Sequence, residues 1–141
     1  MSNAFYSVPV AINEPVKSYA PGSIERETLL NEYSRMYNGH VDVPMYIGDE
    51  QVFTDNKKKL SPPHDHAHAI GTSNYGTEKE VRQAIDAAME ARKKWANMSW
   101  EHRASIFLKA ADLLAGPFRA KLNAATMLAQ SKNVMQAEID A

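Results

Sequence analysis

Residues 77–117 read TEKEVRQAIDAAMEARKKWANMSWEHRASIFLKAADLLAGP, and this stretch decides the fold class. Thr77 and Glu80 have the spacing of a capping box, which predicts the start of a helix. Ser99 is the expected N-cap of a second helix, and Gly116-Pro117 predicts the end of that helix and the start of a third. Apolar residues recur at helical spacing through residue 129: Val81, Ile85, Ala88, Trp95, Trp100, Ile106, Phe107, Ala110, Leu113, Leu114, Phe118, Leu122, Ala125 and Ala129. We expect the set from Ile106 to Leu114 to form a buried stripe and the two tryptophans to be packing residues. If the chain is a fragment, its apolar helix faces are expected to be exposed and to drive self-association.

A fourth helix is predicted at the C-terminal end of the sequence. Asn133 and Gln136 have capping-box spacing, so the helix is expected to begin there. Val134, Ala137 and Ala141 start an apolar stripe, but no glycine, proline or basic residue follows to end the helix. We therefore interpret the chain as a truncated protein that stops inside this element.

The residues before 77 predict one helix and several extended segments. Residues 1–22 contain three prolines and predict an extended arm. Ser23 is the expected N-cap of a helix that ends at Gly39.

The segment after this helix predicts a β-hairpin, because two β-branched and aromatic runs, 43–47 and 51–54, flank Gly48-Asp49. Lys57–Lys59 is interpreted as a solvated turn or as a guard against edge pairing. Residues 66–75 predict one further extended segment. We therefore expect an α/β fold that is mostly helical, with an arm over 1–22 and an incomplete domain over 23–141.

Composition excludes several classes of function. Sixteen basic and seventeen acidic residues give a net charge of -1, which offers no basic surface for nucleic acid or anionic membranes. The apolar runs are far shorter than the ~20 residues of a membrane-spanning helix. Cysteine is absent, so these residues supply no disulfide and no thiol nucleophile.

The segment His64-Asp65-His66-Ala67-His68 is a candidate metal site. In an extended conformation His64, His66 and His68 share one face, with a spacing that suits zinc, nickel or copper. The alternative is a polar turn after Pro62-Pro63, and we favour it because no fourth ligand is evident nearby. We therefore assign no metal site to the chain.

Glu138 is the other candidate residue, because it lies one position from the apolar stripe of the last predicted helix. The alternative is an ordinary residue at the flank of that helix. The six glycines lie at element boundaries and form neither a dinucleotide fingerprint nor a phosphate loop. Serines and histidines show no nucleophile–base arrangement, so we expect neither a catalytic nor a cofactor-binding residue within this chain.

The sequence contains, in this order, Asn13-Glu14-Pro15 followed by Gly22-Ser23, Ile47-Gly48-Asp49-Glu50, the Ala-rich helix 84–95, residues 101–117 and Gln136-Ala137-Glu138-Ile139-Asp140-Ala141. These segments resemble the aldehyde dehydrogenase superfamily, and within it the delta-1-pyrroline-5-carboxylate dehydrogenase branch. The likeness is collinear and extends over almost the whole chain from residue 13.

The resemblance implies roughly the first quarter of such an enzyme, belonging to its NAD-binding domain. The intact enzymes oxidise L-glutamate γ-semialdehyde to L-glutamate with NAD, in proline catabolism, through a cysteine thiolate. In that branch the glutamate of the last motif lines the substrate pocket near the amino-acid end, a role that falls on Glu138. The resemblance places the nucleophile beyond residue 141, so we expect this fragment to be inactive and to bind no NAD.

The resemblance also implies partners and a location. The partners are the remainder of the polypeptide, the small-molecule substrate and further copies of the protein. The location is the cytoplasm in a bacterium, or the mitochondrial matrix in a eukaryote once a transit peptide is removed. Two other classes stay open: a stand-alone helical interaction module and a histidine-rich metal-binding protein.

Overall fold

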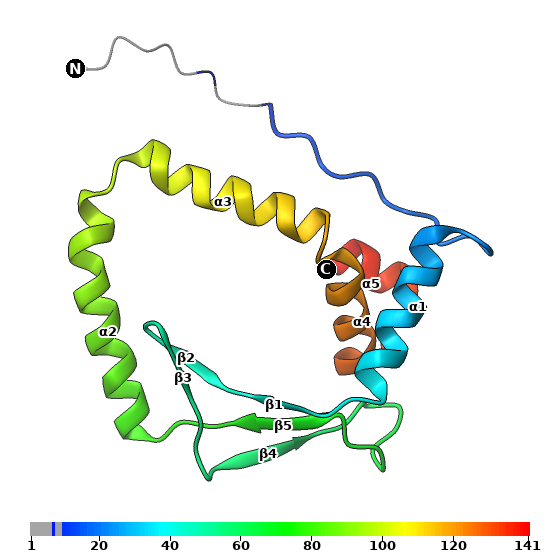
Figure 1. The fold of residues 1–141 in the computed structure, drawn as a ribbon, viewed down its shortest axis with the longest axis horizontal. Coiled ribbons are helices and arrows are strands. Elements are labelled where there is room, and N and C mark those ends of the chain that lie inside the picture. The colour runs from blue at the N-terminus through cyan, green and yellow to red at the C-terminus, as the bar shows by residue number, and fades with distance from the viewer. Residues whose placement is uncertain (1–6, 8–9) are drawn as a thin grey trace.

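The computed structural model describes residue 7 and residues 10–141 and contains helices and strands in mixed order (Figure 1). Residues 10–20 form neither helix nor strand, as predicted for the arm, while residues 1–6, 8 and 9 lie outside the described residues. Among the residues described, no helix is long and apolar enough to cross a membrane. The elements in chain order are α1 (Ile24–Tyr37), β1 (Val41–Val43), β2 (Met45–Ile47), β3 (Glu50–Val52), β4 (Lys57–Leu60), β5 (Gly71–Asn74), α2 (Glu78–Asn97), α3 (Trp100–Ala115), α4 (Arg119–Gln130) and α5 (Val134–Asp140).

The predicted helix starts are confirmed by their caps. Thr77 and Glu80 form the capping box of α2, and Asn133 and Gln136 form that of α5. The Ser99 side chain accepts a hydrogen bond at the start of α3. One start is wrong: α4 begins at Arg119 rather than at Pro117, because residues 117 and 118 form a turn after α3 ends.

The strands form a small mixed sheet and a separate hairpin. β5 lies between β1, which is parallel to it, and β4, which is antiparallel. The predicted hairpin is confirmed as β2 and β3, with Gly48 at a φ of 61° in the turn. Its first strand is shorter than predicted, because Pro44 separates β2 from Val43, which belongs to β1.

Of the two interpretations of Lys57–Lys59, the solvated turn is wrong, because these residues form most of the edge strand β4. The alternative, a guard against edge pairing, fits this position. Edge strands tolerate lysine, since its long side chain keeps the ammonium in water. Lys57 pairs with Asp42 at 2.5 Å, and the Lys58 ammonium lies 4.4 Å from the centre of the Tyr75 ring.

The main packed region lies where α1 contacts α4, with α5 against α4 (Figure 1). Its centre is formed by Leu29 of α1, Ala124 of α4 and Tyr19 of the arm, all buried. Partly buried side chains surround this centre, namely Tyr33, Met36, Met127 and Val134. The arm, α1, α4 and α5 are therefore held together by one apolar cluster.

Helices α2 and α3 pack much less. In Figure 1 they curve away from the other elements, with α2 contacting β2 and α3 contacting α4. The stripe of α3 that was predicted to be buried is exposed in this structure, with Phe107 67% exposed and no residue of α3 buried, which agrees with the exposed apolar faces expected of a fragment. Val81, Ile85, Trp95, Trp100, Ile106 and Leu114 are also exposed. Periodicity identified the helices correctly, but burial requires a second surface against each stripe.

We expect the isolated chain to self-associate through these exposed stripes, because apolar patches of this kind drive contact between molecules. Its mass by light scattering should rise above 15.7 kDa as concentration increases. The double variant Ile106→Lys/Phe107→Glu should shift the chain toward monomer. A wild-type chain that stays monomeric at high concentration would contradict this expectation.

Candidate functional site

Glu138 of α5 is buried at the junction of the arm, α4 and α5, and its side chain is 0% exposed. The Asn133–Gln136 capping box fixes the start of α5, which leaves Ala137 and Glu138 on the inward face. A buried carboxylate is costly unless charges and hydrogen bonds compensate it. The surroundings of Glu138 therefore determine what this site can do.

Each carboxylate oxygen of Glu138 accepts hydrogen bonds. The backbone N–H of Lys17 donates to Oε1 at 2.8 Å. The Tyr19 hydroxyl donates to Oε2 at 2.6 Å, and Asn123 Nδ2 donates to the same oxygen at 2.7 Å. Two of these three donors come from the arm, more than a hundred residues away in the sequence, so the arm is part of the site.

Arg119 compensates the charge of Glu138. Its Nε lies 3.2 Å from Oε2, and its terminal nitrogen forms an ion pair with Oε1. The Arg119 side chain is 11% exposed, so the pair is largely shielded from water. The same guanidinium donates to the carbonyl oxygen of Pro15 at 2.8 Å, which fixes a second point of the arm.

The ionisation of this cluster follows from these contacts. Burial opposes the charge of Glu138, but hydrogen bonds from Arg119, Tyr19, Lys17 and Asn123 outweigh it and lower the pKa of Glu138 from 4.5 to about 2. Burial and the hydrogen bond to Glu138 raise the pKa of the Tyr19 phenol to about 12. At neutral pH the site therefore holds a carboxylate, a guanidinium and a neutral phenol.

A pocket of about 210 Å³ adjoins this cluster. Its polar lining comes from Glu14, Arg119, Asn123 and Glu138. The rest of the wall is apolar and comes from α3, α4 and the chain end, with Ala111, Leu114, Ala115, Leu122 and Ala141. Such a wall suits a small ligand that carries polar groups at one end and a short hydrocarbon stem.

The candidate histidines lie in turns between β4 and β5 and do not converge. His64 Nδ1 lies 2.8 Å from Ser131 Oγ, whereas the His68 ring stacks on Tyr37 with centres 4.1 Å apart. His66 contributes its carbonyl oxygen to Lys59 at 3.1 Å. Within residue 7 and residues 10–141, no three histidine, aspartate or glutamate side chains group in a way that suits a metal ion.

Sequence reasoning named Glu138 as a candidate but did not name the residues that contact it. Arg119 and Asn123 are four residues apart, so they lie on one face of α4 and interrupt its apolar character. Arg119 also places a positive charge at the positive end of a helix, which is unfavourable without an anion nearby. Those two features were readable in the sequence. The contribution of Tyr19 was not, because no local spacing relates it to residue 138.

We expect the low pKa of Glu138 to make the chain sensitive to acid. A carboxyl whose pKa is lowered on folding stabilises the fold above its ordinary pKa of 4.5, and this stabilisation is lost as pH falls toward 2. The shift corresponds to about 3 kcal/mol. Urea unfolding at several pH values should show this loss in the wild type and a shallower slope in Glu138→Gln. Equal slopes in both proteins would contradict the expectation.

The comparisons with known proteins agree with the resemblance described above. The aldehyde dehydrogenase family model matches residues 53–141. The delta-1-pyrroline-5-carboxylate dehydrogenase of Agaricus bisporus is 46% identical over 98% of this chain, which covers 26% of that protein. The mitochondrial human protein of the same name is 41% identical over 92% of this chain, which covers 23% of it.

The chain is also similar to a solved structure of a protein with this name. The delta-pyrroline-5-carboxylate dehydrogenase of Mycobacterium tuberculosis, bound with NAD, superposes with a TM-score of 0.95 at 45% identity. The match covers 99% of this chain and 26% of that one, so the chain spans about a quarter of the length of these relatives. The expectation of an aldehyde dehydrogenase fold is confirmed, and the chain belongs to the aldehyde dehydrogenase family.

Proposed function

We propose that this chain is the N-terminal part of an NAD-dependent delta-1-pyrroline-5-carboxylate dehydrogenase, which oxidises L-glutamate γ-semialdehyde to L-glutamate in proline catabolism. The observation that carries the proposal is the match along 98% of the chain to a relative of that name, at 46% identity. The NAD-bound Mycobacterium structure supports the cofactor. When bound, NAD accepts the hydride from the substrate.

The residues of this chain are proposed to bind the substrate and not to take part in the chemical step. The resemblance implies a cysteine nucleophile, and none of the 141 residues is a cysteine. We assign Glu138 to the wall of the substrate pocket, at the amino-acid end. Its charge cancels that of Arg119, and the Glu14 carboxylate lines the same pocket, so the substrate's ammonium group does not meet a free guanidinium.

The rest of the same polypeptide is the proposed partner of the exposed stripes on α2 and α3. The intact enzyme is further proposed to be a homo-oligomer. Its proposed location is the cytoplasm in a bacterium or the mitochondrial matrix in a eukaryote, and the human relative is named as mitochondrial.

The proposal is tested by NADH formation from L-glutamate γ-semialdehyde, measured for the 141-residue chain and for the full-length protein. We expect no turnover by the chain, because it lacks a thiol nucleophile. The full-length protein should form NADH, and should lose this activity when a cysteine beyond residue 141 is changed to alanine. Turnover by the chain above buffer, or an inactive full-length protein, would contradict the proposal.

A further inference from the structure

Tyr19 is the most unusual residue of the arm. It is 4% exposed, although residues 10–18 around it are exposed. Its φ of 51° lies in the left-handed region, which bulky side chains rarely adopt. Such strain persists where surrounding contacts hold the residue, and it is common at functional sites.

The contacts that hold Tyr19 converge on its hydroxyl and its carbonyl. The hydroxyl donates to Glu138 Oε2 at 2.6 Å and accepts from Asn123 Nδ2 at 2.9 Å. The carbonyl oxygen accepts from the Arg26 guanidinium of α1 at 3.4 Å. The phenol is therefore fixed between α1 and the α4–α5 junction, with its shortest hydrogen bond directed at the carboxylate.

The same carboxylate is held from the other side by the arm backbone. Lys17 N–H donates to Oε1, while Arg119 reaches both Glu138 and the carbonyl oxygen of Pro15. Residues 15–19 thus contact Glu138 and Arg119, two of the three charged side chains that line the pocket, and Glu14 is the third. Loss of the Tyr19 hydroxyl would leave Oε2 without its shortest donor and would leave Asn123 without one acceptor.

We propose that Tyr19 is a positioning residue for Glu138, and that arm residues 15–19 form part of the substrate site. This inference rests on the proposed function. Tyr19 fixes the direction of the carboxylate, and the carboxylate in turn keeps the Arg119 guanidinium from the position of the substrate's ammonium group. The arm therefore affects recognition of the amino-acid end of the substrate, not the oxidation itself.

The test uses the full-length enzyme with Tyr19→Phe, Glu138→Gln and the double variant. The matched control is Tyr33→Phe, because Tyr33 packs on the same core but its hydroxyl faces His64. KM and kcat are measured for L-glutamate γ-semialdehyde, for NAD, and for propanal, which lacks the amino and carboxyl groups.

We expect Tyr19→Phe to raise KM for the semialdehyde roughly 3- to 10-fold, the effect of one hydrogen bond. The kcat, the KM for NAD and the propanal kinetics should not change, and Tyr33→Phe should match the wild type. In the Glu138→Gln background, Tyr19→Phe should add less than about twofold, because coupled residues are not additive. Asn123→Ala is a second variant, which removes a donor both to the Tyr19 hydroxyl and to Glu138 Oε2, and it should shift KM in the same direction.

The outcomes distinguish the proposed role of Tyr19 from the proposed function of the protein. An unchanged semialdehyde KM in Tyr19→Phe and Asn123→Ala, with a raised KM in Glu138→Gln, overturns the role of Tyr19 and leaves the proposed function standing. Unchanged kinetics in Glu138→Gln overturn both the assignment of Glu138 and the role of Tyr19. A Tyr19→Phe effect that is equal for propanal and NAD, or additive with Glu138→Gln, indicates a purely structural role and also overturns the inference.

Discussion

Replacement of Glu138 with alanine is expected to destabilise the 141-residue chain by about 3–5 kcal/mol, the usual cost of removing one partner from a buried ion pair. The variant leaves the Arg119 guanidinium, 11% exposed, without its counter-charge. It also removes an acceptor from Tyr19, Asn123 and the Lys17 N–H. Small domains are stable by only about 5–15 kcal/mol, so the loss is a large part of the total.

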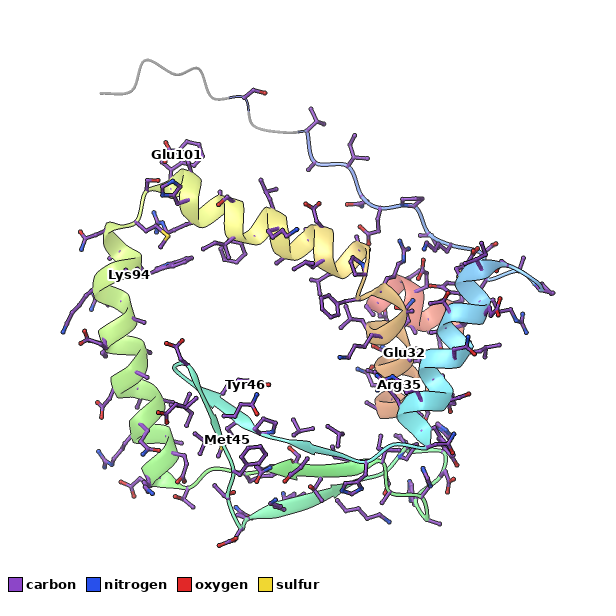
Figure 2. All side chains as sticks on the ribbon, in the orientation of Figure 1. Glu32, Arg35, Met45, Tyr46, Lys94 and Glu101 are labelled. Atoms are coloured by element: carbon purple, nitrogen blue, oxygen red, sulfur yellow. The ribbon has the colours of Figure 1, made fainter. Side chains whose placement is uncertain are left out.

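Urea unfolding followed by far-UV circular dichroism measures this loss. The control is Glu32→Ala, because Glu32 pairs with Arg35 at the surface of α1 beside α4, where the Arg35 side chain is 61% exposed and that of Glu32 is 23% exposed (Figure 2). Exposed pairs of this kind contribute little, so the control should unfold near the wild-type midpoint. Equal midpoints for the two variants would show that the Glu138 cluster does not stabilise the fold.

Elements that depend on contacts between neighbouring residues were predictable from the sequence. The capping boxes at Thr77 and Asn133 depend on residues three positions apart, and both occur in the structure. The hairpin depends on the Gly48-Asp49 turn and its flanking runs, and it also occurs. In each case the interacting groups are neighbours in the sequence, so spacing alone was sufficient.

Features that depend on contacts between residues far apart in the sequence were not predictable in this way. Lys57–Lys59 resembles a turn by composition, but it forms a strand because β5, with Lys58 opposite Ser73, supplies the hydrogen bonds. The stripe of α3 correctly predicted a helix, yet Phe107 is exposed because burial depends on what packs against that stripe. Periodicity indicates which apolar residues share one face of a helix, but it does not show which element packs against that face.

The candidate site likewise has a part that was predictable from the sequence and a part that was not. Glu138 was identifiable from its place beside an apolar stripe and from the family motif. Its partner Tyr19 is 119 residues away, and its contact depends on the path of the arm over α4 and α5. Long-range hydrogen bonds of this kind leave no periodic signal in a single sequence.

Glu138→Gln is expected to impair selectivity for the amino-acid substrate in the full-length enzyme. The amide keeps the shape of the side chain but removes the carboxylate that pairs with Arg119, so Glu14 is the remaining acidic side chain of the pocket lining. A guanidinium and an ammonium about 6 Å apart repel by about 2–3 kcal/mol at an effective dielectric constant of ~20. That energy corresponds to roughly a 30- to 150-fold loss in kcat/KM for L-glutamate γ-semialdehyde. Propanal has no ammonium group, so its kcat/KM should be preserved.

The ratio of kcat/KM for L-glutamate γ-semialdehyde to that for propanal, compared between wild type and Glu138→Gln, tests the account most directly. This ratio shows whether the protein is a dehydrogenase of this substrate and whether Glu138 lines the pocket at the amino-acid end of the substrate. We predict a wild-type ratio far above one and a fall of roughly 30- to 150-fold in the variant. A wild-type enzyme without preference for the semialdehyde, or a ratio that Glu138→Gln leaves unchanged, would contradict the account.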